Sequence, residues 1–346
     1  PVIKFIEDAS NDRNVLAIRQ TLYRVSSENS PIVNALCNAA NRGCRVTVLL
    51  EVKARFDEDR NINLIDKLKA SGCQVIYGLE NLKTHCKLTS IIRKDKNKLS
   101  TYTHMGTGNY NEKTANLYTD ISYFTSNSHI GRDTTTLFNI LSGYSNPKDK
   151  EISSIYFSPY NLRLKLSELI DREKKKGKKG RIILKLNSLS DKDIIDKLYS
   201  ALDKGVDVTI ICRGVCSISR TKRDGTLYKN LTIKSVIGRY LEHSRIYLFG
   251  IGDDTKVFIS SADMLTRNLD RRVELLVPII DINCINKLLE ILAYSIMDNA
   301  NTFIVDENND YIASTEYDVD CHKIFMDKAI SDYRLRSIPI YKKKKK

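Results

Sequence analysis

The sequence lacks the features that mark membrane, secreted and zinc-binding proteins. No apolar run approaches the roughly 20 residues that a helix needs to cross a bilayer. We expect no signal peptide at the start of this sequence, because the acidic residues Glu7 and Asp8 interrupt its first segment. The eight cysteines include neither a Cys-x-x-Cys pair nor a Cys/His cluster at zinc spacing. We therefore expect reduced, buried thiols and a cytoplasmic protein.

Size and charge define the broad class of protein. The 346 residues are enough for two domains. Because the first residue is Pro1 and not methionine, we expect the chain to begin inside a longer protein or to have been trimmed. The net charge is +14, of which two lysine-rich runs, 174–179 and 342–346, supply ten charges. We interpret both runs as solvated segments, and the remaining excess favours an anionic partner.

Helical and strand-like patterns alternate along both halves of the chain. Strands that are joined through helices form right-handed parallel crossovers. We therefore predict an α/β fold of two similar domains, each a largely parallel mixed sheet flanked by helices. Helix-breaking residues concentrate between 144 and 149, which gives domains 1–148 and 149–346. The expected strands are 15–23, 45–51, 74–77, 88–93, 99–104, 182–186, 207–212, 245–249 and 257–260, and the expected helices include 32–41 and 62–70.

A histidine motif that occurs twice is the most informative feature of the chain. His85 stands two residues before Lys87, and His243 stands two residues before Arg245. The two copies predict domains related by a pseudo-twofold axis, with one active site at their interface. Polar residues eleven positions apart follow each copy, and we expect them to orient the histidines. They are Asn109 and Asp120 in the first half, and Asp263 and Glu274 in the second.

Longer strings around these motifs resemble the histidine-phosphorylating polyphosphate kinases. The resemblance extends from the first residues to about residue 298. It implies the two C-terminal domains of that family, which are similar to the phospholipase D superfamily. The N-terminal and head domains of the family, which contribute to nucleotide binding and dimer contacts, have no counterpart in the chain. The matching strings include 83–87 (KTHCK), 104–111 (HMGTGNYN), 115–120 (ANLYTD), 239–245 (RYLEHSR) and 261–270 (SADMLTRNLD).

The resemblance implies reversible transfer of the terminal phosphoryl group of ATP to inorganic polyphosphate through a phosphohistidine. Neutral imidazole suits this role, because it is nucleophilic near pH 7 and can pass the phosphoryl group on. By resemblance His85 is the nucleophile, with Lys87 beside it. His243 is expected to contact the phosphates or to handle the proton, and His104 to assist near the same strand ends.

Four arginines match family arginines around the phosphates, where a planar guanidinium grips two oxygens at once. They are Arg24, Arg55, Arg213 and Arg272. The family associates Arg24 and Arg55 with a Mg²⁺ site. A guanidinium has no lone pair to donate, so we expect both arginines to bind phosphate oxygens that also bind the metal. Tyr118 matches a tyrosine near the nucleotide. Surface salt bridges for the arginines and simple packing for Tyr118 are the alternatives.

The expected partners are ATP, ADP and polyphosphate, and no nucleic acid is expected. We expect the full-length protein to be a homo-oligomer. Its expected location is cytoplasmic, which is compatible with peripheral membrane association. A phospholipase D-like phosphodiesterase is one alternative function. Those hydrolases carry an acid seven residues after the histidine, where this chain has Ile92 and Gly250, and a lysine where it has Arg245. A non-enzymatic module that binds polyanions through the lysine runs is a second alternative.

Overall fold

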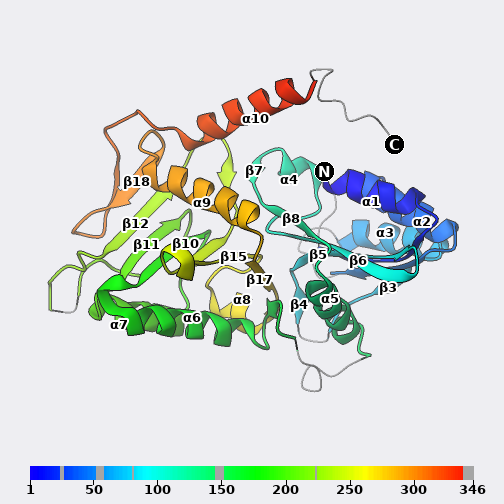
Figure 1. The fold of residues 1–346 in the computed structure, drawn as a ribbon, viewed down its shortest axis with the longest axis horizontal. Helices are drawn as coiled ribbons and strands as arrows, with labels where there is room; N and C mark the ends of the chain where they lie inside the picture. Colours follow the sequence, from blue (N-terminus) through cyan, green and yellow to red (C-terminus); the bar gives the residue numbers. More distant parts are fainter. Residues whose placement is uncertain (24–26, 52–57, 80–81, 145–151, 223, 338–346) are drawn as a thin grey trace.

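The computed structural model describes residues 1–23, 27–51, 58–79, 82–144, 152–222 and 224–337. Two sheets lie in separate halves of the molecule, and helices pack against each sheet (Figure 1). The predicted α/β class with two similar halves is confirmed. The boundary predicted between 144 and 149 falls almost wholly outside the described residues and stays a prediction.

The first half carries a six-stranded sheet in the order β3-β2-β1-β5-β6-β8. The helix at Ser128–Leu141 begins where a short polar side chain caps its free N–H groups: Asn127 accepts from the backbone N–H groups of His129 and Ile130. The helices are α1 (Val2–Asn11), α2 (Pro31–Asn41), α3 (Glu58–Ala70), α4 (Glu112–Ala115) and α5 (Ser128–Leu141). The strands are β1 (Val15–Leu22), β2 (Arg45–Leu50), β3 (Gln74–Ile76), β5 (Lys87–Asp95), β6 (Lys98–Gly106) and β8 (Ser122–Thr125).

The second half carries a nine-stranded sheet in the order β19-β18-β12-β11-β10-β14-β15-β17-β9. Its central six strands repeat the order of the first sheet, which is the pseudo-twofold relation that the repeated motif predicts. The helices are α6 (Leu162–Lys176), α7 (Lys192–Asp203), α8 (Thr266–Asp270), α9 (Ile282–Met297) and α10 (Cys321–Ser337). The strands are β9 (Tyr156–Phe157), β10 (Arg181–Leu186), β11 (Asp207–Cys212), β12 (Leu231–Val236), β14 (Ile246–Phe249), β15 (Lys256–Ser260), β17 (Leu275–Ile279), β18 (Thr302–Val305) and β19 (Tyr311–Ala313).

The two large sheets are mixed, as expected, but the expectation that they are largely parallel is wrong. Within the two large sheets the parallel pairs are β1–β2 and β2–β3 in the first and β10–β11 and β11–β12 in the second. Helices α2, α3 and α7 connect the strands of all these pairs except β11–β12. The strands that follow are added antiparallel, beginning with β1–β5 and β10–β14. The predicted hairpin at 88–104 accounts for one further antiparallel pair, because β5 and β6 are joined by a short turn and must run antiparallel.

Two short strand pairs cross from one domain to the other. Strand β4 (Lys83–Thr84) pairs in parallel with β16 (Arg272–Val273), and β7 (Tyr118–Thr119) pairs in parallel with β13 (Leu241–Glu242). One buried hydrophobic cluster also contains residues of both halves, including Leu88 and Phe138 from the first and Ile246 and Leu292 from the second. The domains are therefore joined by both backbone pairing and a common core.

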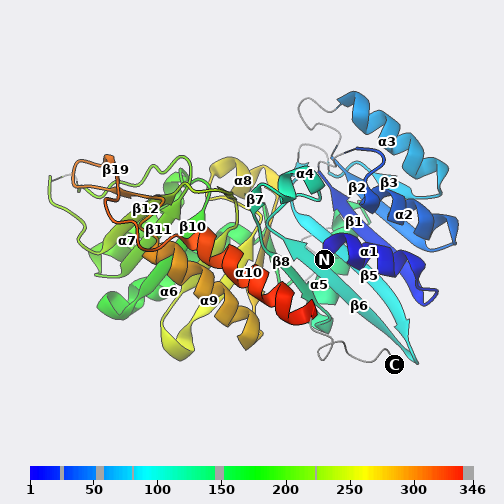
Figure 2. The ribbon, with the colours of Figure 1, turned by 90° about the horizontal axis from the view of Figure 1, so that it is seen from above.

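Helix α10 runs along the outside of the molecule, over α9 and toward the first domain (Figure 2). None of the helices in the described ranges combines the length and the apolar character needed to span a membrane. The first lysine run lies at the end of α6 and in the following 3₁₀ turn (Gly177–Lys179), at positions that are partly or fully exposed, in keeping with a solvated segment. The second run, 342–346, lies outside the described residues.

Truncation of Phe138 should test the common core. Phe138 is 1% exposed, and Phe138→Ala should destabilise the protein by about 3–5 kcal/mol, because it leaves a cavity in a cluster that both domains line. Chemical denaturation followed by circular dichroism should show one cooperative transition at a lower midpoint. Leu99→Ala at an exposed position is the matched control and should change little. Two separate transitions in the unsubstituted protein would contradict a common core.

Candidate active site at the domain interface

His85 follows strand β4 and reaches into the second domain. The carbonyl oxygen of Val273 accepts hydrogen bonds from the backbone N–H groups of His85 and Cys86, each at 2.9 Å. The ring Nδ1 of His85 lies 2.9 and 3.0 Å from the two carboxylate oxygens of Glu274. Because an ionised carboxylate only accepts hydrogen bonds, Nδ1 donates the proton and Nε2 keeps its lone pair. An acid of the second domain therefore fixes the tautomer of a histidine of the first.

Burial and neighbouring cations keep the His85 ring neutral. Burial lowers the pKa of His85 to about 4; Lys87 and Arg272 act in the same direction, and Glu274 opposes them. Burial likewise lowers the pKa of Lys87 to about 8, with Glu274 opposing the shift and Arg245 adding to it. Burial works to raise the pKa of the Glu274 carboxyl, but His85 and Lys87 outweigh it, so the net shift is downward. The site thus holds a neutral imidazole between an anion and several cations.

His243 occupies the mirrored position after strand β13. Its Nδ1 lies 2.8 Å from Oδ1 of Asp120, an acid of the first domain, and its Nε2 lies 3.2 Å from Nη1 of Arg245. The backbone N–H of His243 donates to the hydroxyl of Thr119 on β7 at 3.3 Å. Burial lowers the pKa of His243, and the charge of Arg245 adds to the shift while Asp120 opposes it. Each histidine is therefore held by the acid of the other domain.

The two orienting acids are fixed in turn by hydroxyl groups. Ser261 donates to Oε2 of Glu274 at 2.6 Å, and Thr107 donates to Oδ1 of Asp120 at 2.6 Å. The expected contacts of Asp120 and Glu274 with the histidines are present. The other two residues of the repeat behave differently. Asp263 binds Arg245 through both carboxylate oxygens, at 3.2 and 3.1 Å, and the buried Oδ1 of Asn109 has no hydrogen-bond partner among the described residues.

Cationic side chains approach the histidines from both domains. Lys87 Nζ lies 3.0 Å from each ring nitrogen of His85 and donates to the carbonyl oxygen of the same residue. Arg272 Nη1 lies 3.8 Å from Oε1 of Glu274. Two bonds connect Arg213 to His243 through Asn187, whose side chain accepts from Arg213 Nε at 3.0 Å and donates to the His243 carbonyl oxygen at 3.2 Å. Sequence reasoning gave Asn187 no role.

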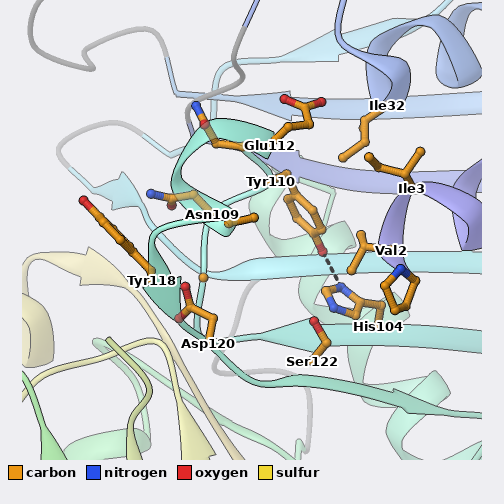
Figure 3. Close-up of a pocket in the computed structure, with 14 residues that line it drawn as sticks. Val2, Ile3, Ile32, His104, Asn109, Tyr110, Glu112, Tyr118, Asp120 and Ser122 are labelled. Atoms are coloured by element: carbon orange, nitrogen blue, oxygen red, sulfur yellow. Dashed lines mark hydrogen bonds between the residues drawn. The ribbon is translucent and has the colours of Figure 1, made fainter. Parts of the chain in front are cut away.

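Tyr118 and His104 border a cavity of about 300 Å³ in the first domain (Figure 3). The ring of Tyr118 lies 5.1 Å from that of His243, so this cavity opens beside the predicted site. His104 is buried, and its Nδ1 lies 2.8 Å from the hydroxyl of Tyr110. Burial lowers the pKa of His104 to about 3. Within the described residues no hydrogen bond joins His104 to His85 or His243.

Two predicted residues, Arg24 and Arg55, lie outside the described residues, so their proximity to the site stays a prediction. Tyr23, which directly precedes Arg24, does contact the site: its ring meets the ring of His85 edge-on at 4.8 Å. The sequence gave Tyr23 no function, because a lone aromatic residue at the end of a strand is usually a packing residue.

The described acids of the site offer no ready ligand for Mg²⁺. The carboxylates of Glu274, Asp120 and Asp263 are each engaged by a histidine or an arginine and by further hydrogen bonds. A magnesium ion prefers carboxylate, phosphate and water oxygens. These residues therefore fit a metal that arrives with phosphate oxygens better than one held by the protein alone.

Comparisons with known proteins agree with this geometry. The family description "Polyphosphate kinase C-terminal domain 1" matches residues 1–147, and "Polyphosphate kinase C-terminal domain 2" matches residues 155–322. The polyphosphate kinase of Bacillus cereus is 45% identical over 316 residues, which cover 90% of this chain and 44% of that protein. The polyphosphate kinase of Campylobacter jejuni subsp. doylei is 45% identical over 322 residues, which cover 92% of this chain and 45% of that protein. The chain thus spans less than half the length of these curated relatives.

Solved structures lead to the same family. The crystal structure of polyphosphate kinase from Porphyromonas gingivalis superposes with a TM-score of 0.86 at 33% identity, over 96% of this chain and 51% of that one. The phosphatidylserine synthase of Haemophilus influenzae superposes with a TM-score of 0.59 at 11% identity, over 96% of this chain and 92% of that one, which shows a shared fold alone. Both family descriptions match, and each of the two histidines is bound by an acid of the other domain. The chain therefore belongs to the polyphosphate kinase family and carries its two C-terminal domains.

Proposed function

We propose that the protein transfers the terminal phosphoryl group of ATP reversibly to inorganic polyphosphate through a phosphohistidine on His85. The observation that carries the proposal is the orientation of the His85 ring. Its Nδ1 is held by the buried carboxylate of Glu274, so Nε2 keeps its lone pair at neutral pH, with the Lys87 ammonium beside it.

The proposed reaction has two displacements at phosphorus. In the first, the lone pair of His85 Nε2 forms a P–N bond, and the bond from the γ-phosphorus to the bridging oxygen breaks to release ADP. In the second, a terminal oxygen of polyphosphate attacks the same phosphorus, and the P–N electron pair returns to Nε2. The Nδ1 proton stays in place throughout, so the phosphorylated ring is cationic. The carboxylate of Glu274 stabilises that cation in a buried setting.

One difference between the repeats favours His85 over His243 as the nucleophile. A cation lies against Nε2 and donates to the carbonyl oxygen of both histidines, Lys87 at His85 and Arg245 at His243. Arg245 stays charged and is clamped by Asp263, whereas Lys87 is a point charge on a flexible stem that can turn toward an approaching phosphate. In this proposal His243 contacts the phosphates or handles a proton during transfer, and Arg213 and Arg272 bind phosphate oxygens.

The nucleotide is proposed to approach from the side of Tyr118, beside the cavity of about 300 Å³. A Mg²⁺ ion bound to the nucleotide would neutralise phosphate charge, with Arg24 and Arg55 gripping the same phosphate oxygens. Polyphosphate, ATP and ADP are the proposed substrates. A cytoplasmic homo-oligomer is the proposed state of the full-length protein.

Removal of the nucleophile should abolish the covalent step. In the full-length protein, His85→Ala should reduce both protein labelling from γ-labelled ATP and polymer synthesis by several orders of magnitude, since no nitrogen remains to form the P–N bond. The label in the unsubstituted protein should be acid-labile and base-stable. His129→Ala on the exposed side of α5 is the control and should label normally. Labelling of His85→Ala above about one tenth of the normal level would refute the assignment.

The rate of labelling should fall at both low and high pH. Because the pKa of His85 is lowered to about 4, its ring stays neutral at pH 5.5 and loses nucleophilicity only as the pH falls through about 4. Lys87, with a pKa lowered to about 8, loses its positive charge as the pH rises through about 8. Single-turnover labelling against pH should therefore be bell-shaped between these values. Lys87→Arg should move the alkaline limb upward, and an unmoved limb would exclude Lys87 as its source.

The charge on Glu274 should matter for chemistry more than for binding. Glu274→Gln keeps the shape of the side chain but removes the anion that stabilises the cationic ring, so labelling of His85 should slow by roughly 100-fold or more. Asp120→Asn makes the equivalent change beside His243. We expect this control to leave formation of the phosphohistidine closer to normal and to slow its transfer to polyphosphate. Equal effects of the two variants on labelling would argue against the separate roles of the histidines.

A further inference from the structure

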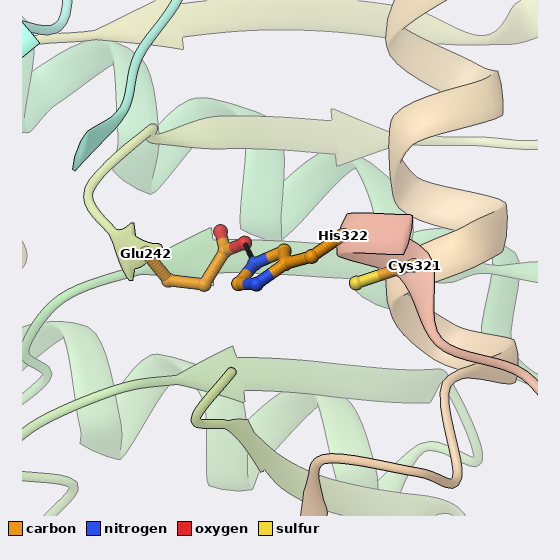
Figure 4. Close-up of side chains that lie close together, drawn as sticks. All are labelled: Glu242, Cys321 and His322. Carbon is orange, nitrogen blue, oxygen red and sulfur yellow. Dashed lines mark hydrogen bonds and ion pairs between the residues drawn. The ribbon is translucent and has the colours of Figure 1, made fainter. Parts of the chain in front are cut away.

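A buried network behind His243 connects it to the C-terminal helix. Glu242, the residue before His243, accepts hydrogen bonds from Lys185 and from Nε2 of His322, the latter at 2.7 Å (Figure 4). Lys185 lies on β10, and His322 lies in the first turn of α10. Sequence reasoning assigned no motif to His322, and the active site described above does not use it.

The network holds the chain on both sides of His243. Lys185 Nζ donates to Glu242 on one side and to the hydroxyl of Ser244, at 2.7 Å, on the other. Glu242 Oε2 also accepts from the hydroxyl of Thr119 at 3.0 Å, and that hydroxyl accepts from the backbone N–H of His243. The backbone position of His243 therefore depends on where the Glu242 carboxylate is held.

Burial gives these contacts their strength. The side chains of Lys185 and His322 are each 3% exposed, and that of Glu242 is 11% exposed. Burial acts to raise the pKa of Glu242, but Lys185 and His322 overcome it and lower the pKa to about 2, so the carboxylate is ionised. A buried ion that loses one partner is strongly destabilised, so its position follows its partners closely.

Helix α10 has few other anchors beside the site. Tyr240 donates its backbone N–H to Nδ1 of His322 at 3.2 Å, and Cys321 donates its backbone N–H to Asp298 at 2.8 Å. Beyond its first turn the helix is largely exposed, and a cavity of about 500 Å³ lies between Phe325 of α10 and the β7–β13 pair. The His322–Glu242 bond is thus a principal direct tie between the described part of α10 and the strand before His243.

The same residues raise the alternative of a metal site. Ligand atoms of Glu242, Cys321 and His322 lie within 4.8 Å of one another. Three features oppose a metal: the Lys185 ammonium already neutralises Glu242, both ring nitrogens of His322 are hydrogen-bonded, and burial raises the pKa of the Cys321 thiol well above its ordinary value. A thiol must lose its proton to bind zinc. The cluster is therefore better suited to hydrogen bonding.

We infer that Lys185, Glu242 and His322 form a positioning network that fixes His243, and that α10 is thereby coupled to the active site. The placement of His243 stands on the contacts alone, whereas its effect on turnover rests on the proposed phosphotransfer. His322 is a positioning residue, because its described contacts reach His243 through Glu242 and Thr119.

Three substitutions in the full-length protein separate positioning from simple destabilisation. His322→Leu removes the donor to Glu242 but keeps an apolar side chain of comparable size. His322→Gln places an amide N–H near the original Nε2 and should restore the bond. Cys321→Ala is the matched control, because it alters the adjacent buried residue of the same helical turn and keeps the hydrogen bonds to Glu242.

The first measurement is independent of turnover. Long-range ¹H–¹⁵N spectra should show His243 as the Nδ1–H tautomer in the unsubstituted protein. In His322→Leu the His243 signals should move toward a mixture of tautomers, whereas His322→Gln and Cys321→Ala should leave them in place. Unchanged His243 signals in His322→Leu would overturn the positioning network. A shift of the His322 signals away from their metal-free positions when Zn²⁺ alone is added would favour a metal site and would also overturn the positioning network.

The second measurement is kinetic. We expect His322→Leu to lower kcat for polymer synthesis by roughly tenfold, with KM for ATP within about twofold, because a displaced catalytic group costs rate more than binding. His322→Gln should recover most of kcat, and Cys321→Ala should retain it even if its melting temperature falls. Equal losses in His322→Leu and Cys321→Ala would reduce His322 to a stability role. If the unsubstituted protein forms no phosphohistidine, the proposed function fails while the spectroscopic result still decides the network.

Discussion

The rest of the site depends on two hydrogen-bonded pairs across the domain interface, in each of which a histidine of one domain binds a carboxylate of the other. Glu274 fixes the tautomer of His85, and Asp120 fixes that of His243. The Glu274 carboxylate is fully buried and the His243–Asp120 pair is partly exposed, and both pairs keep their geometry only while the two domains stay packed. The β4–β16 and β7–β13 strand pairs hold the two domains together at these points, because each strand pair is followed directly by one of the histidine–carboxylate pairs.

Local patterns in the sequence predicted most of the fold. The strands β1, β2 and β3 and the helix α2 lie where hydrophobic periodicity placed them, since each buries one face or both against its own domain. The antiparallel addition of β14 to β10 was not predicted, because the partner of a strand depends on tertiary packing that periodicity does not encode. The repeat spacing identified Asp120 and Glu274, but only the three-dimensional arrangement shows that each serves the histidine of the other domain.

The remaining site residues show why contacts between distant positions cannot be predicted from a single sequence. His322 is 80 positions from Glu242, and no local motif surrounds it. Asn187 connects Arg213 to the carbonyl oxygen of His243 through a side chain that is common in turns. Tyr23 approaches His85 from the position directly after β1 of the same domain. In each case the residue type is compatible with many environments, and only the packing selects one.

The crossed arrangement also has a consequence for how such a protein can change during evolution. Since each half supplies the histidine for one pair and the acid for the other, a single half contains two incomplete pairs and no complete one. An ancestor with one domain would have needed two copies to assemble both pairs. Fusion of the copies makes their pairing independent of concentration and frees the two halves to diverge, as the lysine at position 87 and the arginine at position 245 show.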